Sequence, residues 1–171
     1  VLEYPTEPLT TACAKGIVEP STDSPVNYVN ARHILHERGV ELIESKRSEV
    51  YRYSNLCTVI VEDETGYEFL VSGTVFDASH VRIVTVNDRS FVAVPEGNLI
   101  VIENEDVPGV VGAVGTYFGE KKINISEMTW GTKEGGGTAM TVINVDGDVA
   151  PDVIDGLRNV PNVKKAALIR L

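Results

Sequence analysis

The spacing of apolar residues divides the first part of the chain into two segments. Before residue 40, apolar side chains recur at helical spacing. This spacing predicts a helix from about residue 10 to Val18 and a second one from Ser24-Pro25 to a C-cap at Gly39. A short strand is expected before them, at residues 1–4.

From Val40 onward apolar residues recur with a period of two, which is typical of strands. Strands are expected at residues 40–45, 56–62, 67–76, 81–87 and 90–94. Polar turns at 64–66 and 87–89 separate successive strands. Residues 1–97 therefore read as an α+β domain in which helices accompany an antiparallel meander.

A hinge at Pro95-Glu96-Gly97 precedes a second domain at residues 98–171. Its pattern predicts a strand, a helix, two strands, a helix and a strand, at 98–104, 109–121, 124–131, 138–145, 150–158 and 162–170. The order βαββαβ is that of a ferredoxin-like split βαβ arrangement. Gly135-Gly136-Gly137 is most simply a hairpin loop. The fold class is α+β with two domains.

Composition excludes several classes of function. The net charge is −10, with 43% hydrophobic and 23% charged residues, so a nucleic-acid-binding surface is not expected. No apolar run approaches the ~20 residues of a membrane span. Cys13 and Cys57 lack metal-type spacing, which favours a cytoplasmic protein with reduced thiols. Because the chain begins with Val1, we expect a fragment of a larger polypeptide.

Motifs for catalysis and for cofactor binding are missing from the sequence. The glycines at 109, 112 and 115 lie at intervals of three on the expected helix, which suits close packing or the approach of a ligand rather than a dinucleotide turn. His33 and His36 have no evident third metal ligand. The chain by itself is expected to hold no cofactor or metal and to catalyse nothing.

The most specific local pattern is a strand-to-helix turn. The strand ending near Glu105 runs into Asp106, Pro108-Gly109 opens a helix, and Ile123-Asn124 then starts the next strand. Exposed N–H groups at such a turn suit a small polar ligand. This pattern resembles the ACT regulatory domain, which binds amino acids.

The first half carries a resemblance as well. Residues 26–31, Val-Asn-Tyr-Val-Asn-Ala, and Glu37-Arg38-Gly39-Val40 are similar to the intervening, allosteric substrate-binding (ASB) domain of long-form D-3-phosphoglycerate dehydrogenases, as are residues 71–76 and 82–91. In that family an ACT domain follows, and NAD serves a separate catalytic part. The resemblance implies feedback control of serine biosynthesis by L-serine. The alternatives are the regulatory part of an iron–sulphur L-serine dehydratase and a stand-alone amino-acid-sensing module.

The resemblance also implies an effector site. Asn104, Glu105 and Asp106 would hold the amino group of serine, and Gly109 with the helix start would hold its carboxylate. Ile123-Asn124 would approach from a paired protomer. Asp106 is equally typical of a helix cap, and Asn124 of a residue that bonds its own turn.

Two further expectations concern anions and assembly. Arg82 and Arg89 are candidates for binding phosphate or a phosphorylated substrate in the ASB-like domain, although two solvated surface arginines fit the sequence equally well. The strand at 98–104 is expected to pair through its edge with its own copy, giving a homo-oligomer joined through ACT domains.

Overall fold

The computed structural model describes residues 5–47, 52–77, 79–133 and 135–171. The chain forms two compact units, residues 1–55 and residues 56–171. The strand expected at residues 1–4 lies outside the described residues. The division into domains at 1–97 and 98–171 stays a prediction.

The first unit is built from two helices. Helix α1 spans Glu7–Val18, a 3-10 turn η1 follows at Glu19–Ser21, and α2 spans Ala31–Glu37. Their contact is a small core of Ala14, Val18, Ala31 and Leu35. The predicted end of α1 at Val18 is confirmed, but the helix begins three residues earlier than expected, because Pro8 fits a first turn that needs no N–H donor.

Helix α2 begins six residues later than the start expected at Pro25. The reason is a turn held by asparagine side chains: Asn27 Oδ1 accepts hydrogen bonds from the N–H groups of Val29 at 2.8 Å and Asn30 at 3.0 Å. Such side-chain bonds compete with helical ones. The predicted C-cap is confirmed, since Gly39 has φ +74° and the next N–H, that of Val40, bonds back to Leu35 at 3.0 Å.

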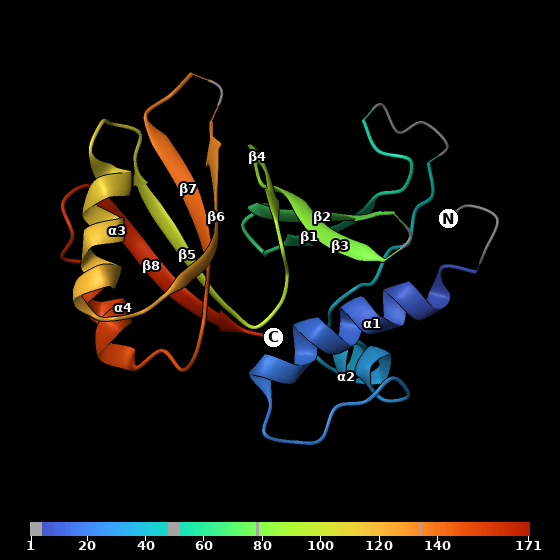
Figure 1. The fold of residues 1–171 in the computed structure, drawn as a ribbon. Coiled ribbons are helices and arrows are strands. Elements are labelled where there is room, and N and C mark those ends of the chain that lie inside the picture. The colour runs from blue at the N-terminus through green and yellow to red at the C-terminus, as the bar shows by residue number, and fades with distance from the viewer. Residues whose placement is uncertain (1–4, 48–51, 78, 134) are drawn as a thin grey trace. The chain divides into compact units, whose positions relative to one another are not determined.

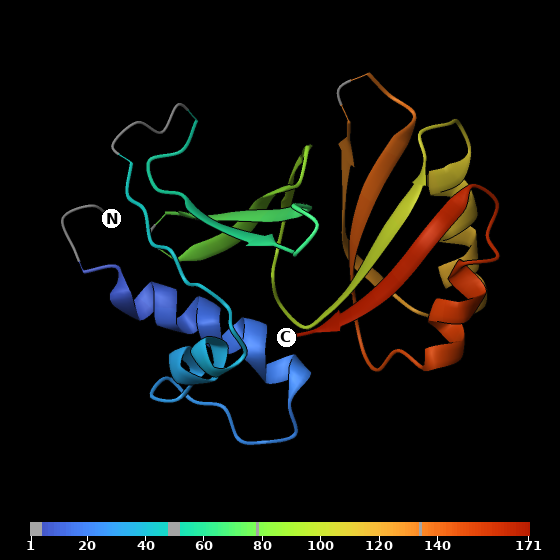
Figure 2. The same ribbon diagram turned by 180° about the vertical axis from the view of Figure 1, so that it is seen from behind.

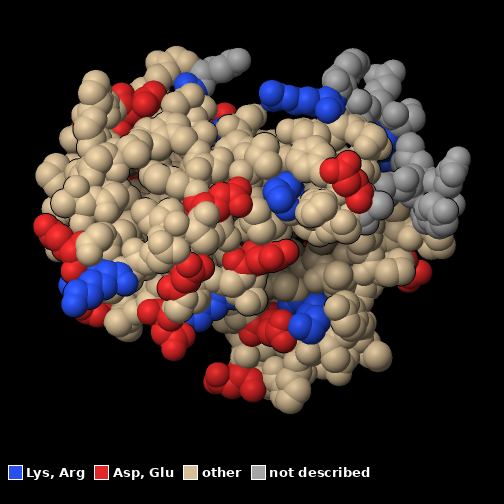
Figure 3. All heavy atoms as spheres, viewed as in Figure 1, with Lys and Arg blue, Asp and Glu red and all other residues tan. Residues whose placement is uncertain are grey.

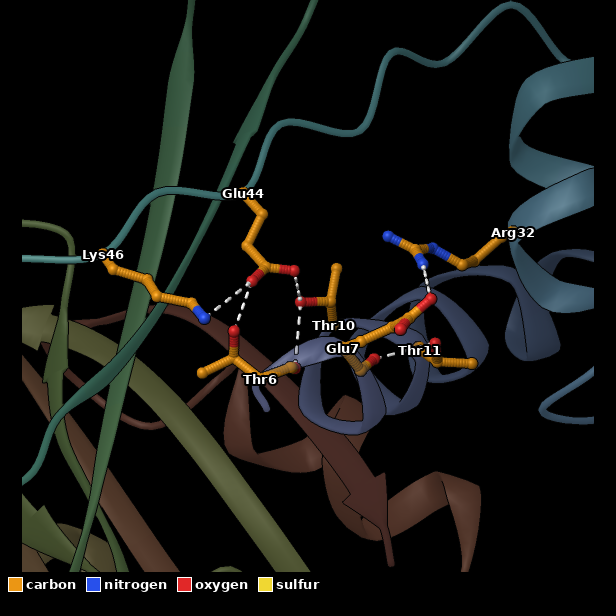
Figure 4. A network of polar contacts seen from close by, with 7 residues as sticks. All are labelled: Thr6, Glu7, Thr10, Thr11, Arg32, Glu44 and Lys46. Carbon is orange, nitrogen blue, oxygen red and sulfur yellow. Dashed lines mark hydrogen bonds and ion pairs between the residues drawn. The ribbon is translucent and has the colours of Figure 1, made fainter. Parts of the chain in front are cut away.

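The strand expected at residues 40–45 is wrong. In the described part of the chain this segment belongs to no sheet, and side chains tie it to α1 instead. Figure 4 shows Glu44 accepting hydrogen bonds from the hydroxyls of Thr6 and Thr10, the second at 2.7 Å. These bonds, that from Thr6 first, lower the pKa of the Glu44 carboxyl.

The second unit begins with an antiparallel sheet, here called the meander sheet. Its strands are β1 (Cys57–Glu62), β2 (Glu68–Phe76), β3 (His80–Val86) and β4 (Arg89–Ala93), in that spatial order. The predicted meander is thereby confirmed for all four strands.

A ferredoxin-like sheet completes the second unit. Its elements are β5 (Asn98–Glu105), α3 (Val110–Glu120), β6 (Ile125–Thr132), β7 (Thr138–Val145), α4 (Pro151–Leu157) and β8 (Val163–Arg170). The strand order is β6-β7-β5-β8, and Figures 1 and 2 show both helices on the same face. The predicted βαββαβ order is confirmed.

Both faces of this second sheet are covered. Ile100 and Ile102 of β5 are fully buried in the core beneath α3 and α4. The opposite face buries Leu99 and Val142 against Phe91 and Ala93 of the meander sheet. Successive residues of β5 therefore serve different cores, which explains its continuous apolar run.

The edge pairing expected for the strand at 98–104 is wrong. Strand β5 hydrogen-bonds to β7 on one side and to β8 on the other, so its backbone groups are already used. The split βαβ topology places its first strand in the centre of the sheet. The edges of this sheet are β6 and β8.

Candidate functional site

The turn between β5 and α3 has the open form that a small ligand requires. Residues 106–109 are all exposed, while the next residue, Val110, is buried at 1% exposure. Gly109 lies at the N-cap with φ +95°, a left-handed conformation that favours glycine. No side-chain hydrogen bond caps α3 among the described residues, so the capping role considered for Asp106 is not observed. The N–H groups of the first turn of α3 are thus left without a side-chain cap.

Asn104 lies beneath this turn rather than on its surface. Its exposure is 0%, and its Oδ1 accepts a hydrogen bond from the Thr141 hydroxyl at 3.1 Å. Its Nδ2 donates to the carbonyl of Glu105 at 2.8 Å. The side chain therefore supports the backbone of the turn, and its amide is already engaged within the protein.

The two acidic residues of the turn differ in their surroundings. The carboxylate of Glu105 forms an ion pair with Lys164 at 3.6 Å, and its N–H donates to Asn162 at 2.8 Å. Asp106 is exposed, and its N–H donates to the carbonyl of Gly137 at 3.2 Å. Asp106 is thus the acidic side chain at the mouth of the turn, held in place through its backbone.

Ile123 and Asn124 precede β6. Ile123 packs against the core beneath the helices, whereas Asn124 is exposed. The Asn124 amide donates to the Asp146 carboxylate at 2.6 Å, so the side chain bonds across to the end of β7 and not to its own turn.

Asp106 and Asn124 lie at opposite ends of the same sheet. Glu105 pairs with Thr138 at the start of β7, and Ile125 pairs with Val145 at its end. These two positions on β7 are roughly 23 Å apart, at about 3.3 Å per residue. Within one chain the two candidate contacts therefore cannot meet on a single serine.

The two candidate anion ligands are also separated. Arg89 pairs with Val86, whereas Arg82 lies four residues further back on β3, roughly 13 Å along the strand. Arg82 donates to the carbonyl of Val81 at 2.8 Å. Arg89 is only 11% exposed and donates to Asp88 at 3.1 Å and to the Thr138 hydroxyl at 2.7 Å. The structure does not bring the two guanidinium groups together.

Sequence reasoning missed several residues around the candidate site. Thr141 looks like an ordinary strand residue, yet it bonds the buried Asn104. Asp88 and Lys133 form an ion pair at 2.7 Å beside Arg89, although 45 positions separate them in sequence. In the sequence, the charged turn Asp88-Arg89 was the local sign of these contacts. The residues that it contacts on the β6–β7 hairpin belong to no sequence motif.

The surface charge and the helices of the described residues bear on the expectations for nucleic acid and membrane. On the face drawn in Figure 3, acidic and basic side chains are interspersed without a continuous basic area. Among the residues that the structure describes, no helix has the length and apolar content required to cross a membrane.

Two family models match the chain. The D-3-phosphoglycerate dehydrogenase intervening domain matches residues 1–87, and the ACT domain matches residues 98–162. The candidate turn, Asn124 and both helices of the ferredoxin-like sheet fall within the second match. Arg82 falls within the first match, and Arg89 lies between the two.

Curated relatives carry the same name across distant organisms. The D-3-phosphoglycerate dehydrogenase of Bacillus subtilis is 34% identical over 163 residues, covering 95% of this chain and 31% of that protein. That of Archaeoglobus fulgidus is 34% identical over 168 residues, covering 97% and 32%. That of Methanocaldococcus jannaschii is 33% identical over 160 residues, covering 94% and 30%.

The chain thus spans about a third of the length of the curated relatives it matches. The part they share is the intervening domain and the ACT domain behind it, in the order the sequence patterns predicted. With the intervening-domain model matching residues 1–87 of 171, this chain belongs to the D-3-phosphoglycerate dehydrogenase family.

Proposed function

We propose that this chain is the serine-sensing, regulatory part of an NAD-dependent D-3-phosphoglycerate dehydrogenase. Its role would be to restrain the oxidation of 3-phosphoglycerate when L-serine, the end product of the pathway, accumulates in the cytoplasm. The observation that carries the proposal is the exposed turn 106–109 of the ACT domain, where Asp106 lies beside an uncapped helix N-terminus.

The chemistry of this turn suits an amino-acid zwitterion. The uncapped N-terminal N–H groups of α3 carry partial positive charge and would receive the carboxylate of serine. The carboxylates of Asp106 and Glu105 would attract its ammonium group, with Lys164 limiting the charge of Glu105. Asn104 would fix the shape of the turn by holding the carbonyl of Glu105.

A second protomer would complete the site. Because Asp106 and Asn124 of one chain lie at opposite ends of the sheet, only a partner that runs antiparallel can bring the two together. A two-fold axis beside the edge strand β6 has this effect, since it places the start of one β6 opposite the end of the other. Strand β6 therefore replaces β5 as our proposed pairing edge, with Ile123-Asn124 at the shared end.

Regulation would then follow from linkage. A ligand that contacts two chains binds the paired arrangement better than the separated one, so it shifts the population toward that arrangement. Serine would in this way select one assembly of the parent enzyme, in which the catalytic part is less active. The proposal also keeps Arg82 and Arg89 as anion contacts of the intervening domain, with Arg82 carrying the interaction because Arg89 is engaged by Asp88 and Thr138.

Mixing two variants tests the shared site directly. Asp106→Ala and Asn124→Ala should each weaken serine binding by about 1–3 kcal/mol for the polar contact removed, so that calorimetry no longer shows sites of wild-type affinity. In an equimolar mixture, each heterodimer holds one site that combines intact Asp106 with intact Asn124. Roughly a quarter of the wild-type number of sites should therefore return on mixing.

The matched control is Asp148→Ala, which removes the same charge from an exposed loop position outside the site. It should bind serine like the wild type. Absence of serine binding to the wild-type chain would overturn the effector assignment. Binding that is lost in both variants but never returns on mixing would overturn the two-protomer geometry alone.

A further inference from the structure

The loop between β6 and β7 contains three successive glycines. Gly135, Gly136 and Gly137 have φ values of +93°, +75° and +94°, left-handed angles that favour glycine. They have no side chains with which to pack, and the N–H of Gly136 donates to the carbonyl of Lys133 at 3.0 Å. This matters because the carbonyl of Gly137 accepts the N–H of Asp106 at 3.2 Å. The candidate effector turn is thus bonded to these glycines.

Contacts from the meander sheet hold both ends of that loop. The Nη2 of Arg89 donates to the hydroxyl of Thr138 at 2.7 Å, at the start of β7. Asp88 accepts from Arg89 at 3.1 Å and pairs with Lys133 at 2.7 Å, at the other end of the loop. We call these four residues, Asp88, Arg89, Lys133 and Thr138, the hairpin junction.

The backbone around the hairpin junction leaves little room for movement. Arg89 and Lys133 form an antiparallel bridge. A Cβ at Gly131 would lie 2.7 Å from Cδ1 of Phe91 and 3.1 Å from the carbonyl of Ser90. Strand β4 therefore crosses the end of β6 at a distance that only glycine permits. The Arg89 side chain is only 11% exposed, so its bond to the Thr138 hydroxyl lies largely out of water, although its other partner, Asp88, is 42% exposed.

We propose that Arg89 is a positioning residue for the effector turn and connects that turn to the meander sheet. Its bond to Thr138 fixes the start of β7, the adjacent carbonyl of Gly137 then holds the N–H of Asp106, and Asp88 with Lys133 fixes the far end of the loop. This inference rests on the proposed effector site. It adds a regulatory route: a ligand that moves Asp106 changes the fit of the hairpin junction, and by reciprocity a change at β4 alters effector affinity.

Two threonines on the same hairpin give a matched experiment. Thr138→Val removes the hydroxyl that Arg89 bonds while keeping the size and strand preference of the side chain. Thr132→Val makes the same change at an exposed position on the other side of the loop. The first readout is hydrogen exchange of the Asp106 amide without any ligand. The second is calorimetric titration with L-serine.

Thr138→Val should speed exchange of the Asp106 amide and weaken serine binding by about 3- to 10-fold, whereas Thr132→Val should change neither. Arg89→Lys should lie between the wild type and Arg89→Met, because an ammonium keeps the charge but lacks the fork that reaches Asp88 and Thr138 together. Unchanged exchange at Asp106 in both Thr138→Val and Arg89→Met would overturn the positioning role, whatever serine does. If the wild type does not bind serine, the effector site fails while the exchange measurement still decides the inference.

Discussion

The two sheets of the second unit have the same number of strands and the same antiparallel pairing, yet they are buried to very different degrees. In β7 of the ferredoxin-like sheet, Thr141 to Val145 are all buried, whereas in β1 every residue but Val59 is exposed. The difference follows from topology. The crossover helices α3 and α4 cover a face of their own sheet, while hairpin connections leave a meander without a cover of its own.

Several side chains of the meander sheet are apolar although they are exposed. Val61 and Phe69, which are 44% and 43% exposed, are register partners, and so are Val75 and Val81, which are 36% and 50% exposed. At its β4 side the meander sheet shares a core with the ferredoxin-like sheet, formed by Phe91 and Ala93 with Leu99 and Val142. The ferredoxin-like sheet thus carries its own helices on one face, and the two sheets cover each other at this shared core.

Matched phenylalanines give the strongest test of this contrast. Phe118 in α3 is 1% exposed, and Phe118→Ala should lower the free energy of unfolding by about 3–5 kcal/mol through lost burial and a cavity. Phe69→Ala in the meander sheet should cost no more than about 1 kcal/mol, because its ring is 43% exposed. Urea denaturation of both variants measures the difference. Equal losses would mean that the apolar face of the meander sheet is covered in solution.

Anion binding would separate the two sheets by function. If Arg82 contributes an anion contact, sulfate or 3-phosphoglycerate should raise the melting temperature, and Arg82→Ala should remove the rise. A charge-assisted contact is worth about 1.5–3 kcal/mol when desolvated, and less at a partly exposed side chain. Arg170→Ala is the control in the other sheet, since Arg170 also donates to one backbone carbonyl, that of Val149 at 3.1 Å. If the rise in melting temperature survives in Arg82→Ala and disappears in Arg170→Ala, the anion binds at the ferredoxin-like sheet and the assignment to Arg82 is wrong.

The sequence predicted the ferredoxin-like half closely because residues next to each strand and helix mark where these elements begin and end. Gly135-Gly136-Gly137 and Asp146-Gly147 bound β7, and its predicted span, 138–145, is the observed one. The candidate turn at 106–109 was also evident, since Pro108-Gly109 marks a helix entry. In these places short-range chemistry decides the structure.

The predictions failed where residues distant in the sequence determine the structure. The alternation at 40–45 suggested a strand, but no neighbouring strand pairs with it in the described chain, and Glu44 bonds to Thr6 and Thr10 instead. The central position of β5 follows from strand order, which periodicity does not reveal. Arg89 looked available for an anion because its partner Thr138 lies 49 residues away. Spacing along the chain cannot report such contacts.

The smallest expected effect concerns the charge at the boundary between the two sheets. A hydrogen bond from Lys133, with added attraction from Lys133 and Arg89, lowers the pKa of the Asp88 carboxyl. Because the folded-state pKa lies below the unfolded one, Asp88 stabilises the fold above the ordinary pKa of an aspartate. That stabilisation is lost as the pH falls through the lowered folded value.

Asp88→Asn should therefore be less stable than the wild type near pH 7, and the gap should close as the pH falls through the lowered folded-state pKa of Asp88. Lys133→Met removes the first cause of the shift, so it should raise the midpoint of the Asp88 carboxyl titration followed by NMR. High salt should narrow the gap, because Asp88 and Lys133 are 42% and 53% exposed and water and ions screen them. A stability gap that persists unchanged at low pH would show that Asp88 acts through packing or its backbone. The contact between the two sheets beside Asp88 would then depend on Phe91 and Gly131 and not on the charge of Asp88.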